Sequence, residues 1–172
     1  MKEITIIGAG LAGSLSALMF ANRGYKVRVF EKRPDMRKEE ISAGRSINLA
    51  LSDRGISALK RASIDKEIMK EVMPMKGRLI HSINGDKSLQ PYSGREGDHI
   101  NSVSRGGLNM KLMDAAEATG KVTFEFGTGC KRIDFDNNLL TLENDAKELR
   151  TVNFDTIIGW TVVAKPRVPT AA

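Results

Sequence analysis

Three glycines near the start of the chain have the spacing of a phosphate-binding turn. Gly8, Gly10 and Gly13 form a G-x-G-x-x-G pattern directly after the apolar run Ile4–Ile7. Gly8 can adopt the backbone angles of a tight turn, Gly10 lets a pyrophosphate approach the main chain, and Gly13 lets a helix pack closely on a strand. Glu31 follows a second apolar run, and its carboxylate can accept hydrogen bonds from ribose hydroxyls. The spacing predicts a binding site for an adenine dinucleotide.

A βαβ unit must position these residues. The sequence predicts a buried strand over 4–7, a helix over 11–23 that ends at Gly24, and a second strand over 27–30. The N-terminal amide groups and the dipole of the helix would face the phosphates. We expect three helix residues to face the sheet, namely Leu15, Leu18 and Met19. This unit alone does not separate FAD from NAD.

Length and composition limit the remaining choices. With 172 residues the chain is long enough for one domain with a real core. The net charge of +6 is spread among acidic residues and only 5% of the residues are aromatic, which argues against nucleic-acid binding. The single cysteine, Cys130, indicates a reducing, cytoplasmic setting and no metal site. No apolar stretch is long enough to span a membrane, so we expect no membrane association.

The segment after this unit reads as a loop followed by helices. The charged stretch 34–44 is bracketed by Pro and Gly and predicts an exposed loop. Ser52 or Asp53 can cap a helix that buries Ile56 and Leu59, and a second helical stretch over 64–72 would end before Pro74. Pro and Gly therefore mark most of the expected boundaries.

The second half of the chain alternates strand and turn patterns. Residues 79–83 and 87–92 flank Asn84-Gly85, which predicts a β-hairpin with positive backbone angles in its turn. Ser104 can cap a helix that buries Leu108 and Leu112. Strand patterns follow at 122–126, 131–135, 139–142, 151–152 and 154–159. The predicted fold is α/β and Rossmann-like, with a parallel sheet as its core and a small antiparallel β insertion.

Several short motifs follow the fingerprint in a definite order. They are RSINLALS at 45–52, PMKGR at 74–78, QPY at 90–92 and SVSR at 102–105, followed by Leu108-Asn109. In this order the motifs resemble those of the kynurenine 3-monooxygenases, a family of FAD-dependent aromatic hydroxylases. The resemblance covers residues 1–159.

The resemblance implies an enzyme that hydroxylates L-kynurenine to 3-hydroxykynurenine with NADPH and O2, in tryptophan degradation on the route to NAD. FAD is the implied cofactor and NADPH the implied co-substrate, without a second dinucleotide-binding domain. The flavin would carry the oxygen chemistry, while the protein orients the substrate ring and excludes water. No protein side chain is therefore expected to be catalytic, and the sequence shows no Ser/His/Asp or paired-carboxylate constellation.

Matched residue by residue, the resemblance implies two sets of binding residues. The cofactor-binding residues are Gly8, Gly10, Leu11, Ala12, Gly13, Glu31, Arg33, Ala50, Arg105 and Cys130. The substrate-binding residues are Arg78, which would grip the kynurenine carboxylate through two hydrogen bonds, and Tyr92, which would add a third. Without the resemblance, Arg78 and Arg105 read as exposed arginines, Tyr92 as a half-buried sheet residue and Cys130 as a small core residue.

The resemblance ends at Gly159. The family continues there with an Ala/Cys-Asp-Gly motif, whereas residues 160–172 of this chain match nothing in the family. We expect a single FAD-binding domain over 1–159, a disordered tail over 160–172, and a truncated, inactive piece of the enzyme. Two other functions stay open, a non-enzymatic or degenerate dinucleotide-binding module and a fragment of an NAD-linked dehydrogenase.

Overall fold

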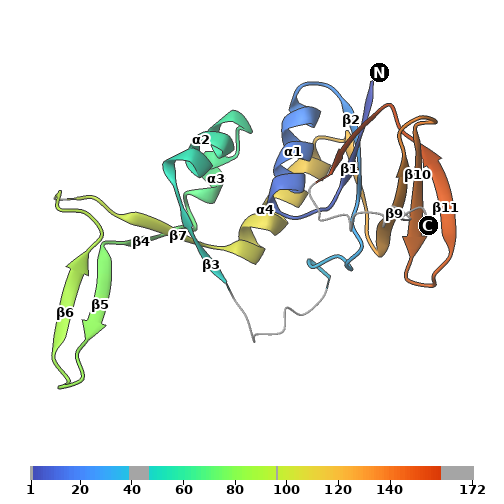
Figure 1. The fold of residues 1–172 in the computed structure, drawn as a ribbon. Helices are drawn as coiled ribbons and strands as arrows, with labels where there is room; N and C mark the ends of the chain where they lie inside the picture. Colours follow the sequence, from blue (N-terminus) through green and yellow to red (C-terminus); the bar gives the residue numbers. More distant parts are fainter. Residues whose placement is uncertain (1, 39–46, 96, 160–172) are drawn as a thin grey trace. The chain divides into compact units, whose positions relative to one another are not determined.

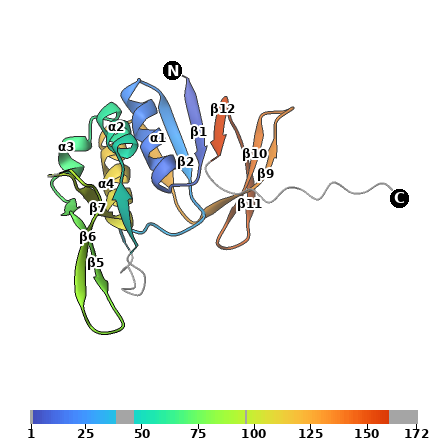
Figure 2. The ribbon, with the colours of Figure 1, turned by 60° about the vertical axis from the view of Figure 1, so that its left-hand side comes forward.

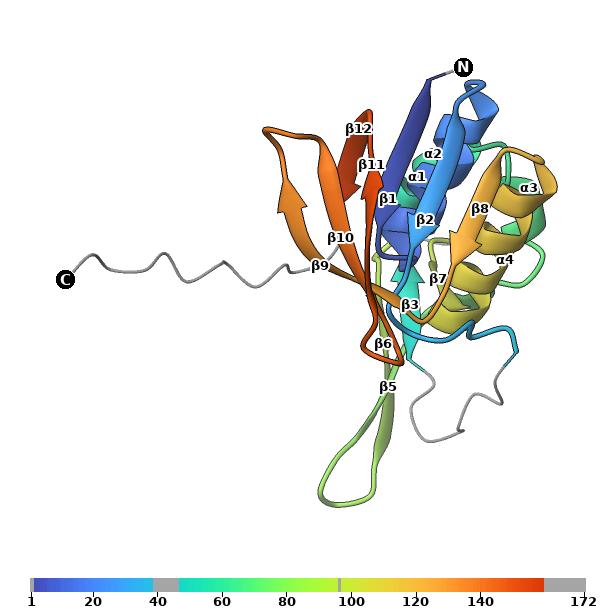
Figure 3. The same cartoon turned by 90° about the vertical axis from the view of Figure 1, so that its right-hand side faces the viewer.

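The computed structural model describes residues 2–38, 47–95 and 97–159. The chain divides into two compact units. The first unit consists of Met1–Glu40 together with Met113–Ala172, and the second unit is Ile41–Leu112. Figure 1 labels the helices and most strands of both units, and β8 and β12 are labelled in Figure 3.

A parallel sheet of four strands forms the centre of the first unit, with α1 lying on one of its faces (Figure 3). Its strand order is β12-β1-β2-β8, and each neighbouring pair is parallel. The strands are β1 (Glu3–Ile7), β2 (Lys26–Phe30), β8 (Val122–Glu125) and β12 (Thr156–Gly159). The central pair β1 and β2 carries the most deeply buried side chains of this sheet, as expected for strands covered on both faces. The predicted parallel core is confirmed.

Helix α1 (Leu11–Asn22) connects β1 to β2, as predicted, and Gly24 follows it with a positive φ of 90°. Its buried residues are mostly small, namely Gly13, Ser14, Ala17, Leu18 and Ala21. Of the three residues predicted to face the sheet, Leu18 is buried, whereas Leu15 and Met19 are only partly buried. Small side chains four residues apart let the helix approach the strands closely, and the larger side chains flank this contact.

A three-stranded antiparallel sheet completes the first unit and confirms the predicted insertion. Its order is β11-β10-β9, with β9 (Thr128–Asp134), β10 (Leu139–Asn144) and β11 (Leu149–Asn153). The sheet shares a hydrophobic core with the ends of β1 and β2, formed by Ile7, Phe30, Leu140, Leu142 and Phe154. Strand β9 begins three residues earlier than predicted, so that it continues directly from the turn after β8.

The second unit contains two short helices, a small antiparallel sheet and a long β-hairpin (Figure 2). The sheet has the order β3-β7-β4, with β3 (Asn48–Leu51), β7 (Ile100–Ser104) and β4 (Met73–Met75). The helices are α2 (Asp53–Arg61) and α3 (Asp65–Ile68), and the hairpin is β5 (Gly77–His81) with β6 (Lys87–Pro91). Helix α4 (Arg105–Ala118) begins in the second unit and ends in the first.

Both predicted serine caps are confirmed. Ser52 Oγ accepts a hydrogen bond from the Gly55 N–H at 3.3 Å, and Ser104 Oγ accepts one from the Gly107 N–H at 3.2 Å. The helix predicted over 64–72 is too long, because only Asp65–Ile68 is helical. Pro74 does not simply end that helix but lies within β4, an edge strand, where a missing N–H is tolerated.

The hairpin is confirmed, but its turn differs from the prediction. Gly85 has a φ of 88°, whereas Asn84 is not among the described residues with positive φ. The Gly85 N–H donates to the Ser82 carbonyl at 3.0 Å, and the Ser82 N–H donates to the Asp86 carbonyl at 2.9 Å. The turn is therefore a three-residue loop with glycine in the left-handed position, and Gly85 provides the positive φ that this loop needs.

Some predictions concern residues that the structure does not describe. They are the end of the 34–44 loop, Arg45 and Ser46 of the RSINLALS motif, and the tail 160–172. Among the described helices, none has the length and apolarity needed to cross a membrane.

Candidate functional site

The glycine turn lies at the carboxyl end of β1, where the chain turns from strand to helix. Gly8 has a φ of 100°, and its N–H donates to the Phe30 carbonyl at 2.8 Å. A Cβ on Gly13 would lie 1.9 Å from the Gly8 carbonyl oxygen, so no larger residue is possible there without moving the backbone. A Cβ on Gly10 would meet no protein atom within 4 Å, because this position faces open space. The two glycines therefore serve different purposes. Gly13 lets the helix pack closely against the turn, and Gly10 leaves room for a ligand to approach the main chain.

Glu31 lies directly after β2 and holds the glycine turn through a long-range hydrogen bond. Its Oε2 accepts from the Ala9 N–H at 2.8 Å, and its Oε1 accepts from the Arg33 N–H at 3.0 Å and Arg33 Nε at 2.9 Å. The Glu31 side chain is 9% exposed and that of Arg33 is 67% exposed. The carboxylate is thus fixed by the backbone, while its arginine partner extends into solvent.

The hydrogen bonds keep Glu31 ionised. Burial by itself would raise its pKa, but the hydrogen bonds from the Arg33 side chain and from the backbone N–H groups of Arg33 and Ala9 outweigh this effect. The pKa of Glu31 therefore lies below its ordinary value. A carboxylate that stays ionised is a permanent acceptor, which suits the two hydroxyls of a ribose and disfavours a ribose phosphate.

A pocket of about 190 Å³ opens beside Glu31. It is lined by Ala9, Glu31, Arg33, Pro34, Met36, Met113 and Phe126. Most of these side chains are apolar, and the carboxylate lies at the polar side, so the pocket can take a flat apolar ring joined to a polar sugar. The adenosine end of FAD matches these donors, acceptors and apolar walls.

Sequence reasoning missed five of the pocket residues, namely Ala9, Pro34, Met36, Met113 and Phe126. Phe126 directly follows β8, which pairs with β2, and ligands in parallel α/β sheets bind beyond the carboxyl ends of the strands. That rule could have identified Phe126. No local pattern could have identified Met113, because only the packing of α4 brings it to the pocket.

Leu11 and Ala12 open helix α1 directly after the glycine turn, as predicted. Gly10 is the N-cap residue in extended conformation, and the Ser14 N–H donates to its carbonyl at 2.9 Å. The N–H groups of the first helical turn have no partner within the helix and can bind an anion. This end of α1 can hold a pyrophosphate next to the pocket.

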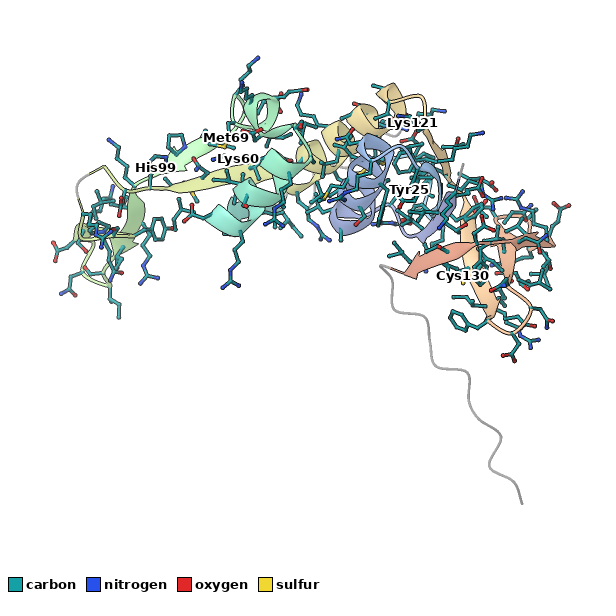
Figure 4. The ribbon with its side chains drawn as sticks, turned by 90° about the horizontal axis from the view of Figure 1, so that it is seen from above. Tyr25, Lys60, Met69, His99, Lys121 and Cys130 are labelled. Carbon is teal, nitrogen blue, oxygen red and sulfur yellow. The ribbon has the colours of Figure 1, made fainter. Side chains whose placement is uncertain are left out.

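Cys130 lies on β9, opposite Leu142 of β10, and packs against the hydrophobic core of the antiparallel sheet (Figure 4). Burial raises the pKa of its thiol, so the side chain is a poor nucleophile. The backbone just before it pairs with the pocket segment, since the Thr128 N–H donates to the Glu31 carbonyl at 2.9 Å. The backbone of β9 runs beside Glu31 two residues before Cys130, whereas the side chain of Cys130 packs against the core.

Ala50 and Arg105 lie on neighbouring segments of the second unit. Ala50 lies on β3 opposite Ser102 of β7, and the N–H of Arg105 donates to the Ile47 carbonyl at 3.0 Å. Both residues are exposed. A ligand could therefore reach the Ala50 backbone and the Arg105 guanidinium at the start of α4.

Arg78 and Tyr92 lie on the hairpin of the second unit. Arg78 is opposite Gln90 and donates from Nε to Gln90 Oε1 at 2.8 Å. Tyr92 follows β6, continues the ladder by donating its N–H to the Lys76 carbonyl at 3.1 Å, and is 44% exposed. Because Tyr92 is two residues from Gln90, it shares a face of the hairpin with Arg78. The structure places the two side chains diagonally on one exposed face.

Comparisons with known proteins agree with this geometry. Residues 1–159 match the family model described as FAD binding domain. The chain is 48% identical over 143 residues to a kynurenine 3-monooxygenase of Myxococcus xanthus, covering 83% of this chain and 31% of that protein. It is 55% identical over 133 residues to one of Cytophaga hutchinsonii, covering 76% of this chain and 29% of that protein.

A solved structure shows the same fold. The p-nitrophenol 4-monooxygenase of Pseudomonas putida superposes with a TM-score of 0.71, at 14% identity, over 92% of this chain and 41% of that chain. The chain spans about a third of the length of the curated relatives it matches.

Proposed function

The chain belongs to the FAD-binding domain family, and on this premise we propose that it is the cofactor-binding part of an FAD-dependent kynurenine 3-monooxygenase. The observation that carries the proposal is that the glycine turn, the buried carboxylate of Glu31 and an apolar pocket meet at the carboxyl ends of β1 and β2. The motifs around Arg78, Tyr92 and Arg105 support the narrower assignment to kynurenine.

The adenosine diphosphate part of FAD would lie in the first unit. The N–H groups at Leu11 and Ala12 would bind the pyrophosphate, which the bare Gly10 admits. Glu31 would accept the ribose hydroxyls, and Arg33 can turn from Glu31 to the ligand because most of its side chain is exposed. The adenine ring would pack against the apolar walls of the pocket.

The resemblance also implies cofactor-binding residues in the second unit, Ala50 and Arg105. The backbone at Ala50 would pass along the flavin, and the guanidinium of Arg105 would pair with polar atoms of the cofactor. Bound FAD would supply the redox chemistry, with NADPH as the electron donor and O2 as the oxidant. The protein contributes binding and orientation, and no side chain of this chain is proposed to transfer a proton.

L-kynurenine would be recognised by Arg78 and Tyr92. A guanidinium can form two parallel hydrogen bonds with the α-carboxylate, and the tyrosine hydroxyl can donate a third. Since Arg78 and Tyr92 are exposed on the hairpin, the chain by itself leaves the substrate open to water. We therefore expect this chain to bind the cofactor without hydroxylating kynurenine. A single cysteine suits a reducing compartment, and we place the enzyme in the cytoplasm.

Titration of the chain with FAD, ADP and NAD tests the proposal. We expect FAD to bind more tightly than NAD, because only FAD offers the flavin contacts at Ala50 and Arg105. Arg105→Met should lower the affinity for FAD and leave that for ADP unchanged, since ADP has no flavin end. Equal affinity for FAD and NAD, unaffected by Arg105→Met, would favour an NAD-linked dehydrogenase or a simple dinucleotide-binding module.

A further inference from the structure

We propose that Arg37 is a positioning residue for the adenosine pocket, because it links the three segments that form the walls of the pocket. This inference rests on the proposed function. Arg37 does not line that pocket. Its guanidinium instead reaches three carboxylates that belong to two different parts of the first unit, and it lies over an aromatic ring from a third.

The first part is the segment that carries the pocket wall after β2. Arg37 Nε and Nη2 donate to the two carboxylate oxygens of Asp35, both at 2.9 Å, and the Arg37 N–H donates to Asp35 Oδ1 at 3.1 Å. The side chains of Asp35 and Arg37 are 8% and 18% exposed. The two residues flank Met36, which lines the pocket. This bidentate pair fixes the turn from which Met36 projects.

The second part is the end of helix α4. Arg37 Nη1 donates to Asp114 Oδ1 at 2.8 Å and to Glu117 Oε2 at 2.6 Å. Asp114 is the neighbour of Met113, whose side chain lines the same pocket and is 1% exposed. Since Asp114 and Glu117 are partly exposed, their bonds are individually weak, and their importance lies in joining α4 to the 35–37 turn.

The third part is the turn after β8. The Arg37 guanidinium lies over the ring of Phe126 at 5.7 Å from its centre, and Phe126 also lines the pocket. Arg37 therefore lies over Phe126, follows Met36 in sequence, and bonds to the residue next to Met113. These three pocket residues come from three separate elements. In the absence of Arg37, three carboxylates would repel one another at this point.

The charges of Asp35 and Arg37 favour an ion pair that is always present. The bond from Arg37 lowers the pKa of Asp35 below its ordinary value, despite burial, which acts in the opposite direction. The hydrogen bonds with Asp35, Glu117 and Asp114 likewise keep Arg37 charged. The Arg37–Asp35 pair therefore stays ionised at neutral pH and can hold the pocket walls before any ligand arrives.

The test compares ligand binding and pocket order in three variants of the full chain. Arg37→Met should weaken ADP binding about tenfold, measured by calorimetry, because the apolar walls lose their common anchor. Arg37→Lys should also weaken it, since an ammonium cannot serve three carboxylates with the geometry of a guanidinium. Lys38→Met is the matched control, because it removes one positive charge from the same segment at an exposed position.

A second measurement reports on the pocket without any ligand. We expect the methyl NMR signals of Met36 and Met113 to shift or broaden in ligand-free Arg37→Met and to stay unchanged in Lys38→Met. If Arg37→Met does not fold, the double variant Asp114→Asn, Glu117→Gln decides, because it removes only the bonds to α4 and should also disturb both methyl signals.

The outcomes separate the two proposals. Failure of the unaltered chain to bind ADP would contradict the proposed function, while the methyl spectra would still decide the role of Arg37. If ADP binds the unaltered chain and Arg37→Met equally well, with unchanged methyl signals, Arg37 has no positioning role.

Discussion

The glycine turn of the first unit and the Arg78–Tyr92 face of the second unit differ in how far the chain itself completes each site. At the turn, a buried carboxylate binds a backbone N–H at 2.8 Å, and a defined apolar pocket lies beside it. On the hairpin, every residue of β6 is exposed, and the Arg78 side chain hydrogen-bonds to Gln90 of the same hairpin. The turn and Glu31 are thus held by buried contacts beside a defined pocket, whereas Arg78 and Tyr92 lie on an open surface.

This difference has a physical origin. The turn, Glu31 and helix α1 belong to one continuous βαβ segment, whose two strands bury most of their side chains. A two-stranded hairpin buries little apolar surface by itself, and Leu79 and Leu89, which face each other across it, remain 54% and 65% exposed. We therefore expect the glycine turn to tolerate few substitutions and the hairpin face to tolerate many.

The largest effect should come from Gly13→Ala. The added Cβ would lie 1.9 Å from the Gly8 carbonyl oxygen, so the turn or the helix must move, at a cost of about 3 kcal/mol or more. We expect the chain to lose ADP binding and to unfold at lower denaturant concentration. Gly10→Ala is the matched control, because its Cβ meets no protein atom within 4 Å. It should fold normally and lose affinity only. Equal stability of both variants would refute the close-packing account.

The same contrast explains which features could be predicted from sequence. The turn and Glu31 were predictable because each glycine has a local requirement and the acid follows the next strand. Strand β4 was not, since its three residues include Pro74 and its pairing with β7 spans the whole hairpin. Met113 reaches the pocket only through the packing of α4. Roles for Ala50, Arg105 and Cys130 stay predictions, because no local geometry defines them.

On the hairpin, Arg78→Lys in the full-length enzyme should raise the KM for kynurenine by about tenfold to a hundredfold, because an ammonium cannot form the bidentate pair with the α-carboxylate. Steady-state kinetics with kynurenine checks this. Flavin content and thermal stability should stay normal, since Arg78 is exposed and far in sequence from the glycine turn. An unchanged KM would remove Arg78 from the substrate site.

A smaller effect is expected for Glu31→Gln. The amide can still accept from the Ala9 N–H but loses its charge, and one of its two polar atoms can no longer accept from the ribose or from Arg33. ADP affinity, measured by calorimetry, should fall about tenfold. If the affinity were unchanged while Gly10→Ala still weakened binding, the acid would hold the turn without touching the ribose.

The smallest effects concern pH, and they have opposite signs in the two units. Glu31 and Asp35 of the first unit have lowered pKa values when folded, so their stabilisation is present above the ordinary carboxyl pKa of about 4 and is lost as the pH falls through the folded pKa. In the second unit, ion pairs with Glu71 and Glu67 raise the pKa of Lys111. That contribution is present below its ordinary pKa and is lost as the pH rises through the folded value. We expect hydrogen exchange to show that the first unit opens before the second at acid pH, and that the second unit opens before the first at alkaline pH.

The most direct test of the account is a competition experiment on the chain itself. If the glycine turn, Glu31 and the adjoining pocket hold the adenosine end of FAD, as we propose, ADP should displace bound FAD, and FMN at the same concentration should not. Filtration followed by chromatographic separation of FAD from FMN measures the released FAD in both cases. Displacement of FAD by FMN but not by ADP would contradict the assignment of the glycine turn, Glu31 and the adjoining pocket to the adenosine end.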